Sequence, residues 1–195
     1  MKRNSIIFLL LISAIHLHAQ SQTDNSSFSN KLSFKAGYYG NFFWDHGLNL
    51  GAEYTWNEKV KVKEKRKGQK TIVRQFLLHG NLGYSTNFTN QTDEGLHTYC
   101  GLIWRRTGHK GWQLNAELNP LGYYRSILPE TIKVEGDDVS SVGLPGRGYY
   151  APSITLGIGR HSGWYLNVNY SLRTPFNSGT LPVFALQFGH RFNFK

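Results

Sequence analysis

The chain has 195 residues, a formal net charge of +10 and one cysteine, Cys100. This length suits a single domain, and one cysteine excludes both an internal disulfide and a thiolate metal cluster. Much of the positive charge lies in one run, Lys59 to Lys70, which does not outline a groove for nucleic acid. Histidines and acidic residues do not recur at metal-ligand spacing. We therefore expect no nucleic-acid partner, no metal and no cofactor.

The first 20 residues have the pattern of a cleaved secretory signal peptide. Lys2 and Arg3 precede a short apolar run, Ile6 to Leu17, and Ala19-Gln20 offers a cleavage point. We therefore predict export by the Sec route. Residues 21–30 are polar and are predicted to form a disordered lead-in. After residue 20 no apolar run is long enough for a transmembrane helix.

Residues 31–195 are predicted to form one all-β domain, because apolar and polar residues alternate along eight segments. The segments are Lys31–Tyr39, Gly47–Trp56, Ile72–Ser85, Leu96–Arg105, Trp112–Tyr124, Tyr149–Gly159, Trp164–Arg173 and Leu181–Phe194. In each, one face is apolar and aromatic, while the other is mostly Gly, Asn, Ser and Gln. Large apolar side chains that face lipid and small polar side chains that face a lumen are typical of a transmembrane β-barrel. We therefore predict an eight-stranded antiparallel up-and-down transmembrane β-barrel, with bulges at Pro120 and Pro152.

The even strand number predicts that both ends of the barrel domain lie on the periplasmic side. The connections 40–46, 86–95, 126–148 and 174–180 then face outwards. The connections 106–111 and 160–163 are predicted to be short periplasmic turns. The third periplasmic connection, 57–70, is long and rich in lysine. We predict that it is a hairpin that runs past the membrane edge and turns near Lys67-Gly68.

Aromatic residues of the apolar face fall into two groups under this arrangement. One group is predicted to form a periplasmic girdle, and its members are Trp56, Trp104, Trp112, Trp164, Phe192 and Phe194. The other is predicted to form an outer girdle, and its members are Tyr38, Tyr84, Tyr150 and Tyr170. Two aromatic belts are expected where a barrel crosses the two membrane interfaces.

The last segment, LPVFALQFGHRFNF, resembles the C-terminal strand of bacterial outer-membrane β-barrels, although Lys195 follows the final aromatic residue Phe194. With the signal peptide, eight amphipathic segments and girdles, the chain looks like the small eight-stranded outer-membrane barrels of the OmpA or OmpX transmembrane type. The resemblance implies localisation in the bacterial outer membrane. It also implies contact with outer-membrane lipid, with lipopolysaccharide and with the barrel-assembly machinery that reads the terminal aromatic residue.

Charged residues on the polar face are predicted to meet inside the lumen. Lys35, Glu53 and Arg191 lie on the first, second and last segments, which are neighbours once a barrel closes. Glu117 is expected near mid-height, with Tyr99 and either Arg105 or His79 in reach. Since buried ions must be paired, we interpret these residues as neutralising charge in a plugged lumen. The alternative is a gate or a proton path.

The function favoured by this pattern is that of a non-enzymatic envelope anchor, adhesin or component of a surface or transfer assembly. The outward connection 126–148 holds four acidic residues and would contact a surface protein partner. One alternative is a lipid A-modifying enzyme of the acyl hydrolase type. Its only adjacent His-Ser pair, His161-Ser162, falls in a periplasmic turn away from the outer leaflet, so we assign no catalytic residue. The other alternative is an exported soluble barrel that binds an apolar ligand.

Overall fold

The structure is a computed structural model that describes residues 30–41, 45–65, 68–87, 94–128, 131–135, 138–142 and 145–193. The predicted signal peptide, the lead-in up to residue 29 and Phe194 lie outside these residues, so those statements stay predictions. Within the described part, no helix is long and apolar enough to cross a membrane.

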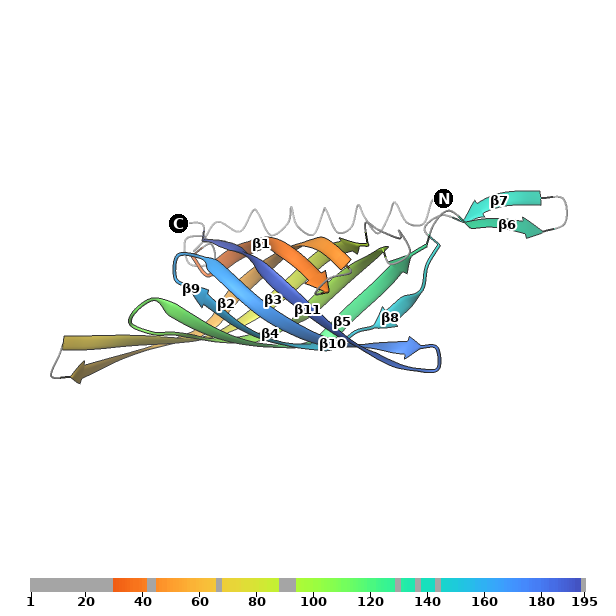
Figure 1. Cartoon of the computed structure of the whole chain (residues 1–195). Helices are drawn as coiled ribbons and strands as arrows, with labels where there is room; N and C mark the ends of the chain where they lie inside the picture. Colours follow the sequence, from red (N-terminus) through yellow and green to blue (C-terminus); the bar gives the residue numbers. More distant parts are fainter. Residues whose placement is uncertain are drawn as a thin grey trace, which may run out of the picture.

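The described residues form a closed antiparallel barrel (Figure 1). Its wall consists of β1 (Leu32–Asn41), β2 (Asp45–Lys65), β3 (Gly68–Thr86), β4 (Glu94–Thr107), β5 (Trp112–Ile127), β8 (Gly148–Tyr150), β9 (Ser153–Arg160), β10 (Trp164–Phe176) and β11 (Gly179–Asn193). Both β8 and β9 pair with β5 and with β10, so together they occupy one position in the wall. The pairing of β11 with β1 closes the ring. The predicted eight-stranded antiparallel barrel is therefore confirmed.

Of the two bulges predicted at prolines, which lack the amide hydrogen that a strand ladder needs, the one at Pro120 is confirmed and the one at Pro152 is not. Cys100 pairs with Leu121 while Leu102 pairs with Leu118, so β5 carries an extra residue at Asn119-Pro120. At Pro152 the strand is interrupted between β8 and β9 without a bulge, because Tyr150 and Ser153 keep one register with Thr174 and Ser171 of β10. There the Pro152 carbonyl accepts a hydrogen bond from the backbone N–H of Leu172 at 3.0 Å, so the wall stays continuous.

The β2–β3 hairpin runs well past the barrel wall, as predicted, and projects from it in Figure 1. Its register continues to the pair Lys65–Gly68, and residues 66–67 between them are outside the described part. Other strands are also longer than their predicted segments, because ladder hydrogen bonds continue beyond the amphipathic stretch. Thus β10 and β11 leave only Asn177 and Ser178 as a turn, both at positive φ, 43° and 68°.

The outer connection 126–148, predicted as a loop, contains a further two-stranded sheet formed by β6 (Thr131–Glu135) and β7 (Asp138–Val142). The prediction missed it because each strand has only five residues, and because β7 lacks the strict alternation that Thr131–Glu135 shows. In Figure 1 this small hairpin extends from the end of the barrel opposite to the β2–β3 hairpin.

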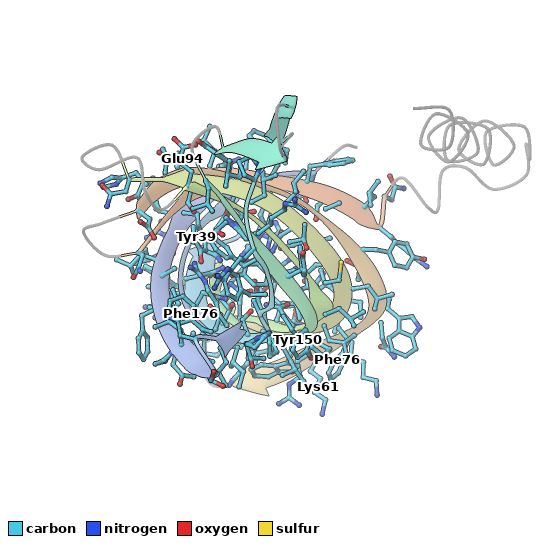
Figure 2. The ribbon with its side chains drawn as sticks, turned by 90° about the vertical axis from the view of Figure 1, so that its right-hand side faces the viewer. Tyr39, Lys61, Phe76, Glu94, Tyr150 and Phe176 are labelled. Atoms are coloured by element: carbon cyan, nitrogen blue, oxygen red, sulfur yellow. The ribbon has the colours of Figure 1, made fainter. Side chains whose placement is uncertain are left out.

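The two faces of the wall carry the residues that the alternation assigned to them. Outward leucines are highly exposed, with 71% for Leu48 and 61% for Leu50, whereas the inward Asn49 is 1% exposed. Figure 2 shows Tyr39 pointing into the ring of strands and Phe76 pointing away from it. A soluble barrel would bury its large apolar side chains and expose charged ones. This molecule does the reverse, which is the organisation of a barrel that faces lipid.

Candidate functional site in the lumen and at the rims

The lower lumen contains an ion cluster centred on Glu53, whose side chain is 1% exposed. The Arg105 guanidinium donates a hydrogen bond to Glu53 Oε2 at 2.5 Å. Lys35 Nζ lies 3.7 Å and Arg191 Nε 3.5 Å from Glu53 Oε1. The pleat of β1, β2, β4 and β11 turns all four side chains inwards. The carboxylate therefore supplies the nearest negative charge to three buried cations.

Glu117 on β5 extends this ion cluster. Its Oε1 lies 3.8 Å from Lys35 Nζ and accepts a hydrogen bond from Asn167 Nδ2 at 3.4 Å. Arg105, expected near Glu117, instead bonds Glu53 and also donates from Nε to Asn115 Oδ1 at 2.9 Å. His79, the other expected neighbour of Glu117, hydrogen-bonds Asn119 through Nε2 at 2.5 Å.

Neutral amides complete the surroundings of the charges, and the sequence prediction did not name them. Arg191 Nη1 donates to Gln113 Oε1 at 2.6 Å. Higher in the lumen, Asn169 donates to the hydroxyls of Ser153 and Thr155 at 3.1 Å and 2.7 Å. The signal that could have found them is their position on the inward face of strands that also carry an inward charge. Buried polar groups need partners, and here they partner one another.

An aromatic layer lies above the polar residues. The His97 ring lies between Tyr39 and Tyr99, with centroid distances of 4.1 Å and 5.4 Å. The two tyrosine hydroxyls are 3.4 Å apart. Towards the outer end, the Arg173 guanidinium lies 3.5 Å from the centroid of the Tyr124 ring. An eight-stranded barrel has just enough room for side chains, and these fill it.

A cavity of about 970 Å³ opens at the end of the barrel that carries both termini of the domain. Its lining includes the buried residues Arg105, Gln113 and Arg191 of the lower lumen. Nearer the rim it is lined by Lys31 and His161, among others. This vestibule therefore ends at the ion cluster.

The aromatic residues predicted to form girdles lie on the outer surface at the two ends of the wall. Those at the end with the termini are exposed by 36–68%, and they are Trp56, Trp104, Trp112, Trp164 and Phe192. Those towards the other end are exposed by 36–49%, and they are Tyr38, Tyr84, Tyr150 and Tyr170. Between them the exterior is a band of exposed Leu, Ile, Val and Phe. Apolar bands flanked by aromatic girdles characterise outer-membrane β-barrels.

The His161-Ser162 pair occupies the tight turn between β9 and β10, which ends with Gly163 at φ 110°. The Ser162 carbonyl accepts a hydrogen bond from His190 Nε2 at 2.9 Å, so this contact uses the backbone of Ser162. Among the described residues, no group of three or more His, Cys, Asp and Glu side chains is close enough to hold a metal ion.

Two solved structures are similar to this chain, and both are of an outer membrane protein. One is Yersinia pestis Ail in a phospholipid bilayer nanodisc, at 13% identity and a TM-score of 0.37, covering 84% of this chain and 99% of Ail. The other is the crystal structure of Ail, the attachment invasion locus protein of Yersinia pestis, at 12% identity and a TM-score of 0.35, covering 83% and 96%. No protein-family model and no curated protein sequence matches the chain. At these TM-scores the barrel assignment rests on the strand pairing of this chain alone.

Proposed function

We propose that the protein is a bacterial outer-membrane β-barrel with a closed lumen, and that it acts as a non-enzymatic anchor presenting residues 126–148 to a surface protein partner. The observation that carries this proposal is the filled lumen, in which Glu53, Glu117 and three cations lie below the Tyr39–His97–Tyr99 layer. A lumen filled in this way leaves the two ends as the contact surfaces for other molecules. Outer-membrane lipid and lipopolysaccharide surround the wall in this proposal, and the barrel-assembly machinery inserts it.

The stem of the outer connection supports a presenting role because it is fixed to the wall. Ser126 N–H donates to the Arg147 carbonyl at 2.9 Å, and Arg147 N–H donates to Ser126 Oγ at 3.0 Å. One step further out, Leu128 N–H donates to the Pro145 carbonyl at 2.7 Å. The β6–β7 hairpin above this stem is therefore held away from the wall on a paired base. Recognition by loops on a rigid scaffold is a common arrangement.

The proposed orientation predicts opposite protease sensitivity at the two ends of the barrel. In intact cells we expect trypsin to cleave after Lys133 in the β6–β7 hairpin and to spare the lysine-rich β2–β3 hairpin. After the outer membrane is permeabilised, the second hairpin should also be cut. Fragment masses by mass spectrometry measure this result. The K133Q variant should lose the first cut alone, and cleavage of the β2–β3 hairpin in intact cells would contradict the orientation.

The single cysteine provides a direct test of membrane insertion. Cys100 lies on the exposed outer face of β4 within the apolar band. A bimane label there should be quenched strongly by nitroxides on lipid acyl chains and weakly by iodide in water. The same label in C100S/S126C should show the reverse, because Ser126 lies in the outer stem at the end of β5. Strong iodide quenching and weak nitroxide quenching at position 100 would favour a soluble barrel.

A further inference from the structure

Beyond the tryptophan girdle, the outward face of the wall becomes basic. Lys59 of β2 pairs with Arg74 of β3, and Arg74 pairs in turn with Arg106 of β4. Residues paired across strands share a face, so three cations stand side by side in one row. All three are exposed, and none forms an ion pair with a described residue. Like charges directly opposite on neighbouring strands destabilise a sheet. An external anion would remove this repulsion.

More cations surround this row. Lys61 and Lys70 lie further along the hairpin, and Lys110 lies in the turn between β4 and β5. We call the outward surface made by Lys59, Lys61, Lys70, Arg74, Arg106 and Lys110 the basic face. The inward face of the same hairpin differs, since it carries Glu58 and Val60. Among the described residues of the hairpin, the positive charge thus lies on the side that continues the lipid-facing surface.

The basic face contains a hollow of about 370 Å³ between the hairpin and the β4–β5 turn. Cationic and apolar side chains line it together, and its lining is Lys70, Ile72, Arg106, Gly108, His109, Lys110 and Trp112. The Trp112 ring also lies 4.8 Å from the guanidinium of Arg160. Basic groups beside an indole at the membrane interface suit a ligand with a phosphate next to a glycerol and acyl chains.

We propose that the basic face binds the anionic head groups of phospholipids in the leaflet on the side of the termini, with one phosphate seated in the hollow beside Trp112. The inference rests on the proposed membrane location. Charge complementarity and continuity with the tryptophan girdle both favour a lipid surface over a periplasmic polymer. A polymer could approach either face of the hairpin, whereas a leaflet contacts the outward face, where the cations lie.

The test compares quenching of Trp112 by brominated phosphatidylglycerol and by brominated phosphatidylcholine in vesicles at equal, low mole fraction. The Trp112 signal is obtained as the difference between wild-type protein and W112F. We expect about fivefold or greater local enrichment of phosphatidylglycerol, since each surface cation changes lipid association by about this factor. The R74Q/R106Q variant should lose this preference. The matched R125Q/R147Q variant removes the same charge near the other end and should retain it.

The outcomes separate this inference from the proposed function. Equal quenching of Trp112 by both lipids would overturn the inference and leave membrane insertion intact. Quenching by neither lipid, together with an unquenched label at Cys100, would overturn both. Equal lipid quenching combined with wild-type retention on purified murein sacculi, lost in R74Q/R106Q, would assign the basic face to the cell-wall polymer and overturn the lipid assignment.

Discussion

Replacing Glu53 with alanine is expected to lower the free energy of unfolding of the barrel by about 3–5 kcal/mol, the range for breaking a buried ion pair. Arg105, Lys35 and Arg191 all lie within 4 Å of this carboxylate. Without it, Glu117 would be the only carboxylate among the described residues within ion-pair distance of any of them, through Lys35. Three buried cations would then repel one another at the inner end of the vestibule.

Urea titration of the protein refolded into lipid vesicles, followed by tryptophan fluorescence, measures this loss. The control is E58A, because Glu58 is an exposed carboxylate whose described contact is a hydrogen bond with Gln75 at 2.7 Å. That change should alter the free energy of unfolding by no more than about 1 kcal/mol. A similarly small effect of E53A would contradict the interpretation of Glu53 as the counter-ion that neutralises the three buried cations.

Introducing arginine at Leu118 is expected to destabilise the barrel in a bilayer by about 2–4 kcal/mol, the range for an arginine at the bilayer midplane. Leu118 is 54% exposed on the outer face of β5. It lies about midway along the strand between Trp112 of one girdle and Tyr123 near the other end. Its guanidinium would therefore enter the apolar band at the depth furthest from either interface.

A matched substitution at the end of the same chain segment isolates the effect of depth. Leu128 is also exposed, by 44%, but it follows β5 in the stem of the outer connection. We expect L128R to lower the free energy of unfolding by about 0–1 kcal/mol, which is the range for an arginine near a membrane interface. Equilibrium unfolding of both variants in vesicles provides the comparison. Equal costs at positions 118 and 128 would contradict the depth profile and the membrane location derived from it.

Period-two alternation was enough to predict the strand number and the faces, because the two sides of a lipid-facing barrel have different surroundings. Leu48 and Asn49 adjoin in sequence and differ by 70 percentage points of exposure, 71% against 1%. The same alternation also placed Glu53, Arg105 and Arg191 on one side of their strands. Local chemistry at Pro120 likewise sufficed for the bulge in β5, since proline cannot donate to the ladder, whereas Pro152 only interrupts the strand pairing.

Contacts across the lumen could not be predicted from sequence in the same way. Two ion pairs, Arg105 with Glu53 and Lys35 with Glu117, connect strands that are not neighbours in the wall. Such contacts depend on strand tilt and stagger, which fix the relative heights of residues around a barrel. The stacking of His97 between Tyr39 and Tyr99 has the same origin. Alternation predicts that a side chain points inwards, but it does not predict which other inward side chains lie at the same height along the barrel axis.

The pairing of β11 with β1 has a consequence for how the protein is made. Its register runs from Ser33–Asn193 to Gly40–Leu186, so these contacts join residues with the greatest separations along the domain. The first strand therefore has an open edge until β11 has been synthesised and exported. A chain cut before Gly179 would keep two unpaired edges, on β1 and β10, and open edges promote aggregation. Closure of the barrel thus depends on the fifteen-residue strand β11, which pairs with both β1 and β10.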